Sequence, residues 1–210
     1  MTGTHIIVLP GGSYTLHAPH EAEPVAEWLE GIGIAASVFR YPVSTRHPEP
    51  LLAIQAEIAR VRAAGATRVG LIGFSAGGHA AGHAALSAGA AVDAAILCYP
   101  VVSMELPTHA GSRAELVGED ASAELRSATS VDRLVTASAP PFFIWHTAED
   151  EAVPVEHSYL LGQALAAHGV PHALHVFPKG PHGIGLAVGE GAASVWPSLA
   201  EDWLRELGWI

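Results

Sequence analysis

The sequence predicts an α/β fold built on a doubly wound, mainly parallel sheet. Six short apolar runs rich in Val, Ile and Phe recur along the chain, and stretches with helical spacing lie between them. The runs are continuously apolar, which is typical of strands that are buried on both faces of a parallel sheet. Half of the 210 residues are hydrophobic and 15% are charged, so the chain can bury a large core. We therefore expect one domain over residues 1–210.

Each expected element rests on its own local pattern. The apolar runs predict strands, which are, in order, residues 5–9, 35–39, 68–74, 94–97, 141–146 and 173–177. Apolar residues at helical spacing predict the helices between and after them, at residues 23–30, 50–64, 76–87, 155–168 and 194–207.

One interval departs from this alternation. Residues 101–140 contain no strand pattern and are rich in Ser, Thr and Ala, with short helical patches at 113–116 and 123–127. A long excursion inside a compact domain is usually a lid or binding loop, which favours a position near the active site. A surface insertion without a role is the alternative.

Charge and cysteine content exclude several classes of protein. Ten basic and 21 acidic residues give a net charge of -11, so the basic surface that nucleic acids and anionic membranes require is missing. No apolar run is long enough to span a bilayer. The single cysteine, Cys98, excludes an internal disulfide framework and a cysteine-based zinc site. Because the N-terminal segment lacks a basic region, we expect a cytoplasmic protein.

The strongest chemical signal is Gly73-Phe74-Ser75-Ala76-Gly77, which lies where a predicted strand ends and a helix begins. A serine in such a sharp turn is the nucleophile elbow of a serine hydrolase, and its neighbours two positions away must be small. The following helix directs its dipole and free amides at the serine, which favours a developing negative charge. A tight turn without catalytic function would also select small residues, so the motif needs partners.

An acid and a base follow in the order that this chemistry requires, serine first, then the acid and then histidine. Asp150 lies in an acidic turn after the predicted strand 141–146, and we expect its neighbours Glu149 and Glu151 to face solvent. A helix N-cap is the alternative role for this turn. His182 lies between Pro181 and Gly183 on a loop after the last strand, where packing does not require a histidine. We predict that His182 is the general base and that Asp150 orients it.

The glycine-rich turn after the first strand predicts an oxyanion hole. We expect the backbone amides of Gly12 and Ser13, together with that of Ala76, to bind the oxyanion. A phosphate-binding loop is disfavoured, since neither of the glycine-rich phosphate motifs is present.

Four further residues are candidate substrate contacts, namely Tyr14, His17, His79 and His109. His79 and His83 have the spacing of two zinc ligands on a helix, but the glutamate that a zinc protease needs is absent between them. His17 and His20 with Glu21 form a second cluster, for which a hydrogen-bonded loop is the preferred interpretation. We expect no metal and no cofactor.

Taken together, these segments resemble the α/β-hydrolase superfamily, and in particular small bacterial esterases of the acetyl-xylan-esterase-like and feruloyl-esterase-related groups. The resemblance covers most of the chain and lies in PGGSY, GFSAGGHAAGH, HTAEDEAVPVEHS and HVFPKGPHGIGLA. It implies a minimal α/β-hydrolase fold with about six mainly parallel strands and no large cap domain. The chain departs from the pattern of the related esterases at Pro10, where they have histidine, and at Ser13, where they have glycine.

This resemblance implies a serine carboxylesterase that forms an acyl-enzyme on Ser75 and hydrolyses short-chain acyl esters, often acetyl groups on sugars. The expected partner is a small-molecule ester, and the oligomeric state is not predicted. Two alternatives stay open. An arylformamidase-like amidase would use the same three residues, and a non-catalytic hydrolase fold would bind a ligand.

Overall fold

The structure, a computed structural model, describes residues 3–87, 89–106 and 109–210. Six parallel strands form one sheet in the order β2-β1-β3-β4-β5-β6. The strands are β1 (Thr4–Leu9), β2 (Ala35–Val38), β3 (Arg68–Phe74), β4 (Ala94–Cys98), β5 (Phe142–Thr147) and β6 (His172–Phe177). The predicted parallel sheet is confirmed, and each strand ends within one residue of its predicted limits.

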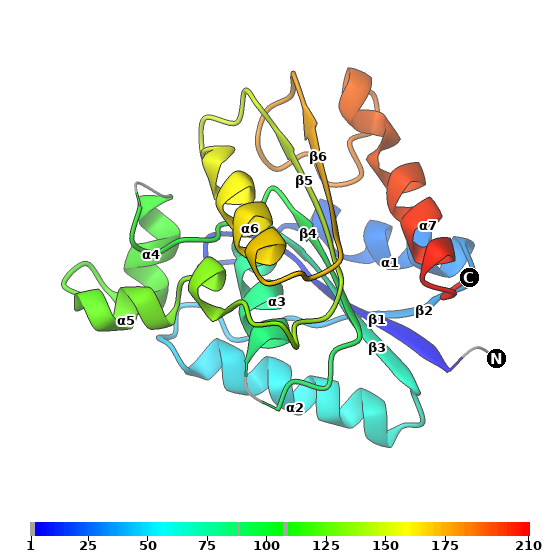
Figure 1. Cartoon of the computed structure of the whole chain (residues 1–210), viewed down its shortest axis with the longest axis horizontal. Helices are drawn as coiled ribbons and strands as arrows, with labels where there is room; N and C mark the ends of the chain where they lie inside the picture. Colours follow the sequence, from blue (N-terminus) through cyan, green and yellow to red (C-terminus); the bar gives the residue numbers. More distant parts are fainter. Residues whose placement is uncertain (1–2, 88, 107–108) are drawn as a thin grey trace.

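Helices cover both faces of the sheet (Figure 1). Helices α1 (Glu23–Gly31) and α7 (Trp196–Glu206) pack on one face, and α2 (Glu49–Ala63), α3 (Ala76–Leu86) and α6 (Glu156–Ala167) pack on the other. Successive residues of β1 therefore enter different cores, Ile7 with the second group of helices and Ile6 with the first. Burial on both faces explains why the strands are continuously apolar.

The excursion between β4 and β5 folds into short helices. It contains α4 (Ala110–Val117), α5 (Ala123–Ala128) and a 3-10 turn, η2 (Val131–Leu134), while residues 107 and 108 of the predicted range lie outside the described residues. Its first residues contact the start of η2, because the amide of Val131 donates to the carbonyl of Val102 over 2.9 Å. In the described part of the chain this insertion lies beside the other helices and is not a cap domain (Figure 1).

The parallel arrangement brings the loops that follow the strands to one edge of the sheet. The segments that follow β1, β3, β4, β5 and β6 all leave from the carboxyl ends of their strands. Ligands of open α/β sheets bind at this edge. Among the residues that the structure describes, no helix is both long and apolar enough to span a bilayer.

Candidate active site

Ser75 occupies the sharp turn between β3 and α3, with φ 53° and ψ -117°. This is a left-handed conformation that costs a residue with a side chain about 1–3 kcal/mol. The turn closes only because its neighbours are glycines. A Cβ on Gly73 would lie 2.1 Å from the carbonyl oxygen of Gly77, and one on Gly77 would lie 2.1 Å from that of Leu9. The structure thus places Ser75 at a tight strand-to-helix turn with its backbone held by close packing.

A chain of hydrogen bonds joins the three residues that the sequence singled out. Ser75 Oγ lies 2.8 Å from His182 Nε2, and His182 Nδ1 lies 2.6 Å from Asp150 Oδ2. With the Nδ1 proton donated to Asp150, Nε2 is free to accept the hydroxyl proton of Ser75. The side chain of His182 is 22% exposed, whereas that of Asp150 is fully buried. This geometry is suited to removing a proton from Ser75.

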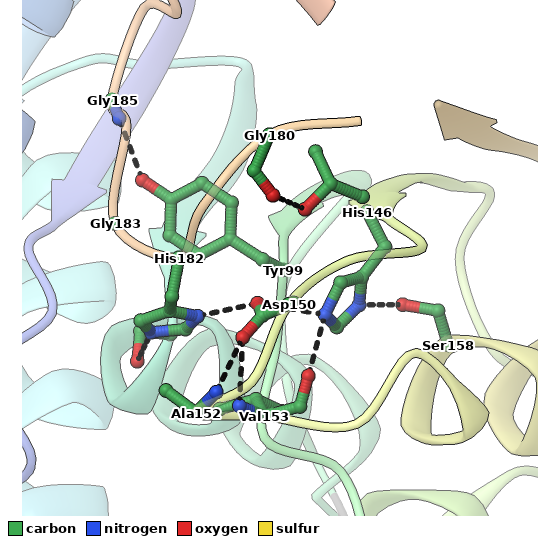
Figure 2. A network of polar contacts seen from close by, with 12 residues as sticks. Tyr99, His146, Asp150, Ala152, Val153, Ser158, Gly180, His182, Gly183 and Gly185 are labelled. Carbon is green, nitrogen blue, oxygen red and sulfur yellow. Dashed lines mark hydrogen bonds and ion pairs between the residues drawn. The ribbon is translucent and has the colours of Figure 1, made fainter. Parts of the chain in front are cut away.

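Asp150 is held in the charged form by its hydrogen bonds. Burial raises its pKa. Hydrogen bonds donated by His146, His182 and the backbone lower the pKa by a larger amount, so the net pKa lies well below the ordinary value. Its Oδ1 accepts the amides of Ala152 and Val153, each over 2.9 Å (Figure 2). The neighbours Glu149 and Glu151 are exposed, as expected.

His146 is a member of this network that the sequence did not reveal. Its fully buried ring lies with Nε2 3.1 Å from Asp150 Oδ2 and 3.0 Å from the carbonyl of Val153. Its Nδ1 lies 2.8 Å from the hydroxyl of Ser158 (Figure 2). His146 therefore fixes the carboxylate from the side opposite to His182. Its position four residues before Asp150, at a strand end, was the one available signal.

The loop after β1 lies directly against the Ser75 turn. A Cβ on Gly11 would lie 3.0 Å from Cβ of Ser75. The next three residues, Gly12, Ser13 and Tyr14, all have positive φ, at 130°, 58° and 63°. Within the described residues, the amides of Gly12, Ser13 and Ala76 donate to no protein acceptor. Free amides beside a nucleophile are the donors that an oxyanion hole requires.

Two of the candidate substrate contacts are buried beneath this loop. Tyr14 is 1% exposed and His79 is not exposed, so neither side chain faces an open site. The Tyr14 hydroxyl lies 2.7 Å from His79 Nδ1, and His79 Nε2 lies 2.7 Å from the carbonyl of Thr129. As placed, this pair joins the loop after β1 to α3 and to the excursion. Substrate contact by these two side chains stays a prediction, and in this structure both are occupied by hydrogen bonds within the protein.

The other two candidates lie nearer to solvent. His17 is partly exposed, and its ring packs edge-on against Tyr41 with ring centroids 4.8 Å apart. His109 caps helix α4 by accepting the amide of Ser112. Burial and the electrostatic effect of His182 lower the pKa of His109, while Asp150 opposes the shift. His109 is therefore within electrostatic reach of the candidate catalytic residues.

An open cavity of about 840 Å³ adjoins Asp150 and His182. It is lined by residues 148–152 and 180–182, a set of small, charged and proline residues without a large apolar side chain. Among the described residues, no group of three or more His, Cys, Asp or Glu side chains could hold a metal ion. The described side chains and backbone of the site present hydroxyl, imidazole, carboxylate and amide groups.

The buried histidines of α3 predict a loss of stability in acid. Burial lowers the pKa of His79 to about 3 and that of His83 to about 4, whereas an unfolded histidine titrates at 6.5. The unfolded chain then binds more protons than the folded chain as the pH falls below 6.5. We expect the free energy of unfolding, measured in urea, to fall by about 2 kcal/mol between about pH 6 and about pH 5. Partly buried histidines with lowered pKa values add to this slope, namely His5, His17, His47, His109 and His175.

The variant His83→Gln tests whether the buried histidines of α3 cause this pH dependence of the unfolding free energy. It removes one of the two strongly shifted groups and is expected to make the unfolding free energy clearly less dependent on pH over the same interval. An unchanged slope in this variant would mean that other groups control acid stability.

Comparison with known proteins identifies relatives over most of the chain. Residues 49–201 match the prolyl oligopeptidase family. Endo-1,4-beta-xylanase B of Butyrivibrio fibrisolvens is 32% identical over 87% of this chain and 32% of its own length. The acetylxylan esterase of Xylanibacter ruminicola is 28% identical over the whole chain and 45% of its own length. The chain thus spans less than half the length of these curated relatives.

Solved structures match the chain more completely. A structure described as an acetyl ester-xyloside bifunctional hydrolase from Caldicellulosiruptor lactoaceticus is 41% identical, with a TM-score of 0.95 over 99% of this chain and 84% of that one. A carboxylesterase from Lactobacillus plantarum is 31% identical, with a TM-score of 0.85 over 98% and 86% of the two chains. The expected α/β-hydrolase fold is confirmed by such neighbours.

Proposed function

Since the chain belongs to the prolyl oligopeptidase family, we propose that it is a serine carboxylesterase that hydrolyses short-chain acyl esters through an acyl-enzyme on Ser75. The observation that carries the proposal is the hydrogen-bonded series Ser75, His182 and Asp150, which lies beside unpaired backbone amides. Esterases and hydrolases among the relatives support an esterase activity.

Acylation begins when Ser75 Oγ attacks the ester carbonyl carbon and its proton passes to His182 Nε2. The carbonyl oxygen becomes an oxyanion, which the amides of Gly12, Ser13 and Ala76 stabilise. Asp150 stabilises the imidazolium of His182 through the Nδ1 hydrogen bond. When the oxyanion collapses, the bond to the alcohol oxygen breaks, and His182 returns the proton to the departing alcohol.

Deacylation repeats these steps with water as the nucleophile. His182 takes a proton from a water molecule, and the resulting hydroxide attacks the acyl carbon on Ser75. The second oxyanion collapses to a carboxylic acid, and His182 returns its proton to Ser75 Oγ. The enzyme is restored, and one ester and one water have become an alcohol and an acid.

The fold favours a small acyl group, because the described part of the chain has no cap domain that would enclose a long acyl chain. A buried methylene contributes about 0.8 kcal/mol only where apolar surface covers it. Two of the relatives carry names that refer to acetyl esters and to xylan or xyloside. Acetylated carbohydrates are therefore the proposed natural substrates.

An acyl-length series tests this assignment. With aryl esters of acetate, butyrate and octanoate, we expect kcat/KM for acetate to exceed that for octanoate by about 10-fold or more, because the longer chain gains no buried contact. A preference for octanoate would contradict the proposed substrate class. An N-formyl anilide in the same series tests the amidase alternative. Acetylated xylo-oligosaccharides test whether the alcohol part of the ester is a carbohydrate.

A further inference from the structure

A buried carboxylate, Glu21, lies between the loop after β1, which carries the candidate oxyanion donors Gly12 and Ser13, and Tyr99 at the end of β4. It belongs to a 3-10 turn, η1 (Pro19–Glu21), and is only 2% exposed. Its Oε2 accepts the amide of Gly11 over 2.8 Å, and its Oε1 accepts the hydroxyl of Tyr99 over 2.6 Å. A carboxyl group is costly to bury unless hydrogen bonds compensate it. The mechanism described above gives Glu21 no part in proton transfer.

Tyr99 connects Glu21 to the loop that carries His182. Its hydroxyl donates to Glu21 and accepts the amide of Gly185 over 2.8 Å. Its ring lies edge-on to the imidazole of His182, with ring centroids 5.0 Å apart. Figure 2 shows Tyr99 reaching from the end of β4 toward Gly185, with His182 beside it. One buried tyrosine thus contacts the base directly and the oxyanion loop through Glu21.

The backbone of Tyr99 indicates that this placement is held by its surroundings. Its φ is 37°, a left-handed value that is unfavourable for an aromatic residue. Burial and the charge of Glu21 raise the pKa of the Tyr99 hydroxyl well above its ordinary value. The phenol therefore keeps its proton throughout the neutral range and acts as a constant donor to Glu21.

We propose that Glu21 and Tyr99 are positioning residues of the esterase reaction, which fix the loop of Gly12 and Ser13 relative to the loop of His182. Gly11, whose amide Glu21 holds, immediately precedes the first of the proposed oxyanion donors. Gly185, whose amide Tyr99 holds, lies three residues after His182. The oxyanion donors and the base must keep one geometry while the substrate reacts, and a misplacement of about 1 Å can cost about 100-fold in rate. The inference rests on the proposed esterase function.

Steady-state kinetics on an aryl acetate test the proposal in the full chain. Tyr99→Phe removes both hydrogen bonds of the hydroxyl and keeps the ring, and Glu21→Gln can keep only one of two acceptors. We expect each variant to lower kcat by about 10-fold with KM within about twofold of the parent value. The double variant is expected to lose about as much as the more affected single variant, because both changes break the same connection.

Ile58→Val serves as the control for destabilisation, since Ile58 is a buried residue of α2 outside the network. It is expected to lower the melting temperature and to leave kcat unchanged. The proposal is overturned if the two single variants keep the parent kcat, if Ile58→Val loses kcat in proportion to its stability, or if the two losses simply multiply in the double variant.

Amide hydrogen exchange provides a readout that does not depend on catalysis. In Tyr99→Phe the amide of Gly185 loses its direct acceptor, and we expect faster exchange there and also at Gly11, which Tyr99 reaches only through Glu21. Unchanged protection of Gly11 would contradict the connection between the loops. If the parent protein hydrolyses no ester while the exchange result holds, the esterase function fails and the connection stands. If ester hydrolysis persists in the parent and the exchange and kcat are unaffected in the variants, only the connection fails.

Discussion

Replacing Ser75 with alanine is expected to lower kcat/KM for an aryl acetate by about 10⁴-fold or more, because the acyl acceptor is lost. The fold is expected to persist, since the Ser75 hydroxyl contacts His182 and supports no helix or strand. Alanine at this position keeps the backbone conformation as unfavourable as serine does, so the melting temperature changes little. Activity and melting temperature of the purified variant provide the measurement.

A matched control for Ser75→Ala lies at the other end of the same helix. The hydroxyl of Ser87 donates to the carbonyl of His83, and Ser87→Ala removes that bond far along α3 from the turn. This variant is expected to retain the parent turnover. If Ser75→Ala kept most of its activity, the assignment of the nucleophile would be wrong.

The second large effect is expected at Asp150, where Asp150→Asn should lower kcat by about 10²- to 10⁴-fold. Asparagine can keep the two backbone amides on its oxygen, and its amide group then presents hydrogens to His182 and His146. His182 Nδ1 must in that case accept a hydrogen bond, which moves the ring proton to Nε2. A protonated Nε2 cannot accept the Ser75 hydroxyl proton.

The neighbouring carboxylate supplies the control. Glu149→Gln makes the same change of charge one residue away, at an exposed side chain without a part in the hydrogen-bonded series. We expect this variant to keep kcat within about twofold of the parent value. A large loss of kcat in Glu149→Gln, together with full activity in Asp150→Asn, would show that the assignment of Asp150 as the catalytic acid is wrong.

The elements that local pattern controls were predictable from the sequence. The Ser75 turn could be located because a continuous apolar run, two glycines and a helical pattern follow one another within a short segment. The parallel sheet then required that loops after successive strands meet at one edge, which places Asp150 and His182 near Ser75. The order of the strands within the sheet could not be predicted from the sequence, because hydrophobic periodicity carries no information about which strands are neighbours.

The residues that local pattern did not reveal are joined by contacts distant in the sequence. Glu21 and Tyr99 are separated by 78 positions. The sequence indicated Glu21 only as part of a cluster with His17 and His20, and Tyr99 has no local feature that distinguishes it from a core aromatic. The burial of His79 likewise depends on Thr129, 50 positions away. His146 was not identified from the sequence because a strand end gives no information about the conformation of the following turn.

The central claim is an acyl-enzyme on Ser75, and mass spectrometry of the protein quenched in acid during turnover of an aryl acetate tests it most directly. We predict that one acetyl group is added to the peptide that contains Ser75, and that the modification disappears once the substrate is exhausted. Acetylation confined to another residue would contradict it.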